Sequence, residues 1–155
     1  MVSPELLRRY PFFGDLTDAQ LKSIAMISEE VEVPEGTHLF SEGHSADHLY
    51  LLMNGSVDLT FTSQEEFRPE TKRDFPVGEI NPGEVFGISA VLAPYVYTAT
   101  ERTSQPSKVI KIDAVSLRAM MAEDCEAGFT LMNQICRALM ERLTYTRVQL
   151  AAAWS

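Results

Sequence analysis

The residues from Phe86 to Thr100 have the types and spacing expected of a binding site for a small anion. They read FGISAVLAPYVYTAT, so a Phe-Gly pair opens the stretch, a short apolar helix should follow, and Tyr-Thr-Ala-Thr closes it as a strand. Unpaired N–H groups at a helix N-terminus, with the positive end of the helix dipole, favour a phosphate or a carboxylate. The stretch contains no charged side chain. Backbone amides would therefore supply most of the binding.

The hydrogen-bond donors expected in this site are backbone amides and hydroxyl groups. We predict that the amides of Ile88, Ser89 and Ala90 face the ligand. The hydroxyls of Ser89, Tyr97 and Thr98 can donate as well. The candidate ligand-binding residues in this stretch are Phe86, Gly87, Ile88, Ser89, Ala90, Tyr97, Thr98 and Ala99.

Three histidines raise the alternative of a metal site. His38, His44 and His48 lie close together in the chain with Glu42 between them, a set similar to the ligands of cupin-type metal enzymes. The usual His-x-His pair is missing, and the Glu42-Gly43-His44 spacing would place these side chains on different faces. The other interpretation is that His44 and His48 flank an exposed turn and that His38 lies on the solvent side of a strand. We expect no metal and no cofactor.

Nucleophilic catalysis has no support in the sequence. No Ser/His/Asp or Cys/His arrangement has a recognisable spacing, and Cys125 and Cys136 fall on expected helices. We expect a binding protein rather than an enzyme.

Composition indicates one domain, spanning residues 1–155, in a reducing compartment. The net charge is −9, with 22 acidic and 13 basic residues, which opposes direct binding to nucleic acid. The two cysteines form neither a CxxC motif nor a disulfide framework, so a cytoplasmic location fits best. No signal peptide is recognisable and no apolar run approaches about 18 residues, so we expect no membrane segment.

The elements that must position the candidate site fall into three zones. Residues 1–27 should form short helices near 4–9 and 17–26, the second with a capping box of Thr17 and Gln20. Residues 28–113 alternate with period two between turns, which predicts a small β-roll. Asn54-Gly55 is the strongest hairpin signal in this zone. The charged segment 63–74 shows no alternation and is expected to be a mobile excursion between two strands.

Residues 114–155 have a helical period. A short helix from Asp113 should precede a long one that starts after Asp124 and runs to about Ala153. Apolar residues recur in it at alternating spacings of three and four, a heptad seam. We expect the seam to pack on the roll as far as Met140 and to form a two-fold dimer contact beyond it. The seam consists of Phe129, Met132, Cys136, Leu139, Leu143, Thr146 and Leu150.

The order of these elements resembles the cyclic nucleotide-binding domain of the catabolite-activator and protein-kinase regulatory-subunit superfamily. The resemblance covers about Leu6 to Ala153, and its first signature is LFSEGHSADHLYLLMNG at residues 39–55. It implies an α+β fold: a jelly-roll-like, double-stranded β-helix capped by N-terminal helices and a long C-terminal helix. It also implies a phosphate-binding cassette at residues 86–100.

This sequence departs from the family pattern at the two charged positions of the cassette. The pattern is Phe-Gly-Glu, a short helix, then Arg-(Ala or Ser)-Ala-Thr, in which Glu takes the ribose 2′-hydroxyl and Arg pairs with the cyclic phosphate. Here Ile88 replaces the Glu and Tyr97 replaces the Arg. Losing two charged hydrogen bonds would weaken nucleotide binding by about two to four orders of magnitude.

Residues of the long helix are the candidates to compensate. In bacterial members a polar residue there, often from across the dimer, touches the base, and Thr146 is similar in position. Arg142 or Arg147 would also replace the missing cation if either side chain entered the pocket.

The resemblance therefore implies a regulatory or sensor domain that binds a cyclic nucleotide or another small anion, as a homodimer through the C-terminal helix. Family members that regulate transcription carry a helix-turn-helix domain after this helix, whereas this sequence stops at Ser155. It would then signal through a protein partner, belong to a longer protein, or act alone. A scaffold that binds partners and no nucleotide stays open as the alternative.

Overall fold

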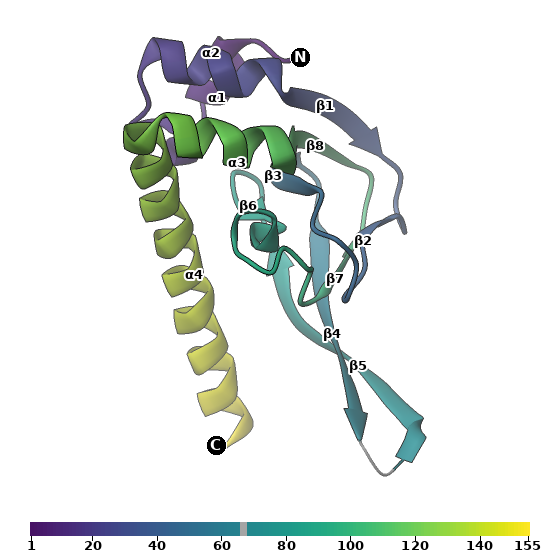
Figure 1. Ribbon diagram of the computed structural model, residues 1–155. Helices are drawn as coiled ribbons and strands as arrows, with labels where there is room; N and C mark the ends of the chain where they lie inside the picture. The colour runs from purple at the N-terminus through teal and green to yellow at the C-terminus, as the bar shows by residue number, and fades with distance from the viewer. Residues whose placement is uncertain (66–67) are drawn as a thin grey trace.

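The computed structural model describes residues 1–65 and 68–155, and it has the α+β architecture that the resemblance implies (Figure 1). Two helices and a 3-10 turn come first, followed by the strands and then two further helices. In chain order the elements are α1 (Pro4–Arg8), η1 (Pro11–Phe13), α2 (Asp18–Met26), β1 (Ser28–Val33), β2 (His38–Phe40), β3 (His48–Asn54), β4 (Val57–Glu65), β5 (Arg68–Ile80), β6 (Val85–Phe86), η2 (Ile88–Val91), β7 (Thr100–Thr103), β8 (Ser107–Asp113), α3 (Ala114–Glu123) and α4 (Cys125–Ala153).

The strands form two antiparallel four-stranded sheets, with the orders β1-β8-β3-β6 and β2-β7-β4-β5. Consecutive strands alternate between the sheets in several places, which gives the double-stranded β-helix expected from the resemblance. The roll brings β7, which follows the cassette, between β2 and β4.

The Asn54-Gly55 turn does not close a hairpin, so that prediction is wrong. β3 and β4 lie in different sheets, and the turn carries the chain from one to the other. Gly55 has φ +100°, and a Cβ there would lie 2.1 Å from Ser107 Oγ. The Ser56 amide donates to the same Ser107 oxygen over 3.2 Å. Tertiary contact with β8, rather than local pairing, sets the conformation of this turn.

The segment 63–74 forms most of a hairpin instead of an excursion without strands. β4 and β5 pair from Val57↔Ile80 outward, through Thr62↔Asp74 and Ser63↔Arg73. Residues 66–67 lie outside the described residues. The ladder satisfies backbone groups whatever the side chains are, so a polar sequence without alternation can still extend a paired strand.

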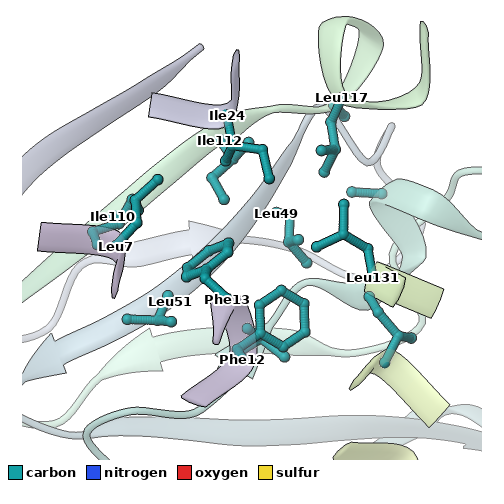
Figure 2. Packing of buried hydrophobic residues seen from close by; sticks show 14 of the residues in the cluster. Leu7, Phe12, Phe13, Ile24, Leu49, Leu51, Ile110, Ile112, Leu117 and Leu131 are labelled. Carbon is teal, nitrogen blue, oxygen red and sulfur yellow. The ribbon is translucent and has the colours of Figure 1, made fainter. Parts of the chain in front are cut away.

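The main core lies between the N-terminal helices, the first sheet and the start of α4 (Figure 2). Leu49 and Leu51 on β3 and Ile110 and Ile112 on β8 point into it, and each is at most 1% exposed. Figure 2 shows Phe13 of η1 packed among them.

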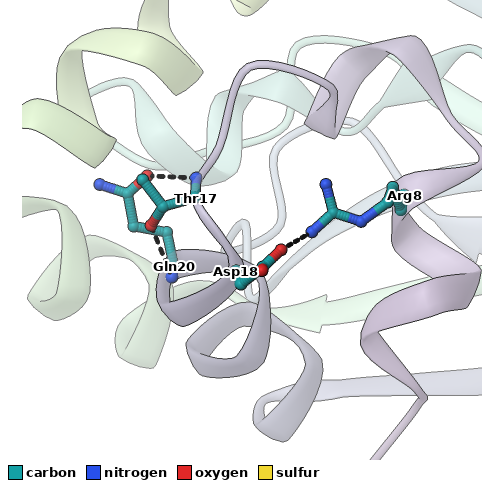
Figure 3. A network of polar contacts seen from close by, with 4 residues as sticks. All are labelled: Arg8, Thr17, Asp18 and Gln20. Carbon is teal, nitrogen blue, oxygen red and sulfur yellow. Dashed lines mark hydrogen bonds and ion pairs between the residues drawn. The ribbon is translucent and has the colours of Figure 1, made fainter.

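Local polar contacts fix the N-terminal helices. The Thr17 hydroxyl accepts from the Gln20 amide, while Gln20 Oε1 accepts from the Thr17 amide, which confirms the capping box (Figure 3). Figure 3 also shows Arg8 of α1 paired with Asp18, the first residue of α2. Gln20 Nε2 donates 3.1 Å to Asp124, whose carboxylate caps α4 through the Ala127 amide. The start of α4 is thereby tied to α2.

The face of α4 that packs on the core is not the predicted seam. Ala127, Gly128, Leu131 and Ile135 are the buried residues of the helix. A Cβ on Gly128 would lie 2.8 Å from the carbonyl oxygen of Met121 in α3. Because α3 and α4 approach each other closely at Gly128, the residues of α4 on the same face as Gly128 are the ones that face the core. The expected packing of the seam on the roll as far as Met140 is therefore wrong.

Much of the seam is exposed to solvent, although Leu139 and Thr146 line hollows on the side of α4 that faces the roll. Phe129 is 75% exposed, and Leu139, Leu143 and Leu150 are also exposed. From Leu143 to Ala153 every residue of α4 is exposed. Exposed apolar side chains thus follow one another along α4.

Candidate ligand-binding site

A hollow of about 440 Å³ lies where the cassette meets the roll and α4. Its walls come from β2, β4, β7, the segment after β6 and the middle of α4. The lining residues are Phe40, Leu59, Gly87, Ile88, Ser89, Leu92, Ala93, Pro94, Val96, Tyr97, Thr98, Ala99, Glu101, Leu139 and Arg142.

Gly87 places the start of the cassette against β3. It has φ +72°, and a Cβ there would come within 3.2 Å of the His48 carbonyl oxygen and of the Tyr50 ring. Only glycine combines this backbone with so close an approach. The 3-10 turn η2 starts at the next residue, Ile88.

The amides of the cassette are partly free. The Ala90 amide donates to the Gly87 carbonyl oxygen over 3.0 Å, so it is not available to a ligand. The amides of Ile88 and Ser89 have no acceptor among the residues that the structure describes. The Ile88 side chain turns into the main core, where it is 6% exposed. Two of the three predicted backbone donors remain.

Tyr97 contributes a ring to the hollow but no free hydroxyl. Its hydroxyl donates to the His48 carbonyl oxygen over 2.6 Å and accepts from the His48 amide over 3.2 Å. Burial raises the pKa of Tyr97 to about 12. The predicted hydrogen bond from Tyr97 to an anion is therefore not available, because the donor is already used.

The structure brings together most of the predicted site residues, but not all. Gly87, Ile88, Ser89, Tyr97, Thr98 and Ala99 line the hollow. Phe86 and Ala90 are fully buried and do not line it. Thr146 lines a neighbouring hollow of about 230 Å³ instead, and its hydroxyl donates 2.8 Å to the Arg142 carbonyl oxygen.

Glu101 is the acidic residue that sequence reasoning missed. It lies on β7, is 2% exposed, and its Oε2 has no hydrogen-bond partner among the described residues. Burial raises the pKa of Glu101 to about 8, while the positive charge of Arg142 opposes that rise. The signal was the alternation on β7, where Glu101 and Thr103 are buried and Arg102 between them is exposed. Period-two alternation directs such a glutamate inward.

Arg142 enters the hollow from α4, whereas Arg147 is exposed to solvent. The Arg142 guanidinium donates to the carbonyl oxygen of Val85, just before the cassette. Burial lowers the pKa of Arg142, and the negative charges of Glu101 and Glu84 oppose that change. Because an arginine pKa is so high, the side chain stays charged at neutral pH. Of the two arginines predicted as replacements, Arg142 lies in the right place.

A second arginine holds the cassette to α3. Arg118 donates to the Ala90 carbonyl oxygen over 2.6 Å. Its guanidinium also lies 4.0 Å from the centre of the Tyr95 ring, a cation–π contact. Arg118 thus contacts both η2, through Ala90, and the turn that follows it, through Tyr95.

The three histidines do not converge. In the described part of the chain, no three His, Cys, Asp or Glu side chains are grouped so that they could hold a metal ion. His38 and His44 are exposed, and Glu42 accepts a hydrogen bond from the Thr62 amide. The cupin-like alternative gains no support from this geometry. Nor is any helix in residues 1–65 and 68–155 long and apolar enough to span a membrane.

Comparison with known families agrees with the fold and the cassette. A sequence model of the cyclic nucleotide-binding domain matches residues 30–124, from β1 to the end of α3. The chain belongs to this family. The match includes the cassette and Glu101 but ends before Arg142, so it covers the roll and not the long helix of this cyclic nucleotide-binding domain.

Two solved structures are similar to this chain in both sequence and fold. A structure from Geobacter metallireducens GS-15, of a protein named for cyclic nucleotide binding, is 39% identical with a TM-score of 0.79, and the match covers 92% of this chain and 99% of that one. The N-terminal domain of a transcriptional regulator from Streptomyces coelicolor A3(2) is 28% identical with a TM-score of 0.66, over 88% and 93% of the two chains.

The CRP-like cAMP-activated global transcriptional regulator of Mycobacterium tuberculosis is 24% identical over 147 residues. The match covers 95% of this chain but only 61% of the length of that regulator.

Proposed function

We propose that this cyclic nucleotide-binding domain is a cytoplasmic regulatory sensor that takes a small anionic ligand, a cyclic nucleotide, in the hollow between cassette and α4. The observation that carries the proposal is the position of Arg142. Arg142 lines the same hollow as Ile88 and Ser89, the two residues whose amides have no acceptor among the described residues. A charge-assisted hydrogen bond from an arginine is among the stronger contacts to a phosphate. Arg142 therefore replaces the cation that Tyr97 cannot supply.

The source of this cation determines how binding would be transmitted. An arginine in the cassette would hold the ligand to the roll alone, whereas Arg142 belongs to α4. Its guanidinium contacts the Val85 carbonyl oxygen. A ligand anion would compete for that guanidinium, and the competition would shift the population of α4 arrangements.

Calorimetric titration with cyclic AMP and cyclic GMP tests the proposal, with Arg142→Gln and Arg147→Gln as matched variants. Loss of one charged hydrogen bond should weaken binding about 10- to 150-fold in Arg142→Gln. Arg147→Gln should bind as the wild type does, because Arg147 is exposed. Equal affinities of wild type and both variants would assign the anion to the backbone alone.

A scaffold that binds no nucleotide is the second candidate, favoured by one observation. The Tyr97 ring is stacked on Phe40 and is 4% exposed, so aromatic packing occupies part of the position where the family has its arginine. Absence of binding at millimolar cyclic AMP and cyclic GMP would support this candidate.

We further propose that the domain forms a homodimer through the exposed seam of α4. The seam is apolar and exposed, and Leu139 lines the ligand hollow while belonging to the seam. A dimer contact there would link the hollow to the interface through one residue. A protein partner on the same row is the other occupant that the chemistry allows.

A further inference from the structure

Burial of the Glu101 carboxyl group beside the hollow is expected to destabilise the fold. Its side chain is almost completely buried and its Oε2 lacks a partner. A buried polar group without a hydrogen bond is destabilising, and an ionised one more so. Core packing therefore does not account for a glutamate at this position.

No internal partner accounts for it either. Arg142 is the cation that acts on Glu101, yet within the described residues the two form no ion pair, and Arg142 donates to Val85. The register neighbours of Glu101 are Leu59 on β4 and Phe40 on β2, both apolar. Glu101 is a lining residue of the hollow, and its Oε2 is an acceptor that no described residue uses.

We propose that Glu101 is a specificity-determining residue, which accepts a hydrogen bond from an N–H or O–H donor on the ligand whose anionic group Arg142 holds. The inference rests on the proposed ligand-binding function and narrows it. The ligand must carry a donor as well as an anion. A cyclic nucleotide has two such sources, the ribose 2′-hydroxyl and an amino group of the base. A site with a buried acceptor discriminates strongly against an analogue that lacks the donor.

Ligand analogues that lack either the ribose 2′-hydroxyl or the amino group of the base show which of these two donors binds Glu101. The probes are cyclic AMP and cyclic GMP, their 2′-deoxy forms, and their deaminated forms, cyclic purine riboside phosphate and cyclic inosine phosphate. Removing the donor that faces Glu101 should weaken binding to the wild type about 10- to 150-fold. In Glu101→Val, whose side chain has similar volume and no acceptor, the same removal should change affinity less than about threefold. Equal discrimination in wild type and Glu101→Val would overturn the inference.

The stability of the empty domain gives a readout that needs no ligand. Glu101→Val removes an unpartnered buried carboxyl, so Tm should rise by about 3–9 °C. Thr103→Val is the matched control, since Thr103 is the next inward residue of β7 and its hydroxyl donates 2.7 Å to the Pro34 carbonyl oxygen. That variant should lower Tm. A fall in Tm for Glu101→Val would make the carboxyl a structural group and overturn the inference.

Binding should also depend on pH. A donor binds an ionised carboxylate more strongly than a protonated one, so the ligand favours loss of the Glu101 proton. The charged or titratable groups around Glu101 are Arg142, Tyr50 and Tyr97, and burial raises the pKa of both tyrosines above the range used. Affinity should rise between pH 6 and 8 by at most about tenfold per pH unit. Glu101→Gln should abolish the rise, and a rise that persists in this variant contradicts the inference.

The two proposals fail in different ways. Wild-type protein that binds no cyclic nucleotide removes the proposed function, and this inference with it. Wild-type protein that binds cyclic nucleotides through Arg142 but treats every analogue alike removes the role of Glu101 alone.

Discussion

The ring of Tyr97 is stacked on the ring of Phe40, with 3.7 Å between centroids and 11° between planes. The ring of Phe40 in turn lies 5.7 Å from that of Tyr50 and 6.3 Å from that of Phe86. The stack therefore continues into a second cluster of buried residues, which includes Tyr50, Leu52, Val57 and Phe86. The cassette of this domain is therefore anchored by aromatic packing at the position where the family pattern has a charged side chain.

Removing the Tyr97 hydroxyl should cost stability without a large loss of ligand affinity. In Tyr97→Phe the stack remains, but the buried His48 carbonyl and amide groups lose their partner, which should lower the free energy of unfolding by about 1–3 kcal/mol. Tyr95→Phe is the control, because Tyr95 is exposed. Urea denaturation compares the two. An unchanged midpoint in Tyr97→Phe would show that the hydroxyl is not needed for folding.

Stability should fall as the pH rises toward 8. Burial raises the pKa of folded Glu101 from 4.5 to about 8, so between these values the folded state binds more protons than the unfolded state. The contribution of the neutral carboxyl is fully present below the unfolded pKa and is lost as pH passes the folded pKa. The limiting slope is about 1.4 kcal/mol per pH unit. Denaturation of wild type and Glu101→Gln from pH 5 to 9 should show a steeper fall for the wild type, and parallel curves would contradict the assignment.

The crossing at Gly55 should tolerate no side chain. Gly55→Ala would place its Cβ against Ser107 in a backbone conformation with φ +100°, at a cost of about 3 kcal/mol or more. Gly43→Ala is a matched control with φ +86° and no atom within 4 Å of the added Cβ. Only the backbone strain of about 1–2 kcal/mol applies there. Thermal denaturation should rank the variants in this order, and equal losses would mean that contact with β8 is unimportant.

A charge in the seam should separate the proposed dimer. Leu143→Glu places a carboxylate in the exposed apolar row, whereas Thr144→Glu adds the same charge on an exposed face outside it. In sedimentation or light-scattering measurements the first variant should be monomeric and the second should keep the wild-type mass. A wild type that is monomeric at all concentrations would instead leave the row to a different protein partner.

Local signals in the sequence predicted most of the elements. Capping residues located α2, and the long helix begins and ends where Asp124 and the absence of proline suggested. The turn at Gly55 and the inward face of α4 were not predicted. Both depend on a glycine in close contact with a distant or neighbouring backbone, and a sequence pattern does not indicate which atom lies opposite a glycine.

The sequence predicted the backbone segment that forms the candidate site, but it did not predict the buried Glu101 and did not decide between Arg142 and Arg147. The cassette residues from Gly87 to Ala99 follow one another in the chain, so their grouping is local. Glu101 and Arg142 meet at the hollow only because β7 lies inside the second sheet and α4 passes beside it. Arg142 was predicted as one of two alternatives, and its place in the hollow and its hydrogen bond to Val85 distinguish it from the exposed Arg147.

The distal part of α4 also has a mechanical consequence. Beyond Arg142 the helix continues for about 16 Å to Ala153 with every residue exposed. A change in the tilt of α4 at the hollow would therefore move the far end of this segment the most. A tilt of about 10° at the hollow would carry the far end about 3 Å sideways, given the length of the segment. A small tilt of α4 that leaves the packing of the roll unchanged would thus move the end of the helix far enough to alter its contacts with a neighbouring molecule.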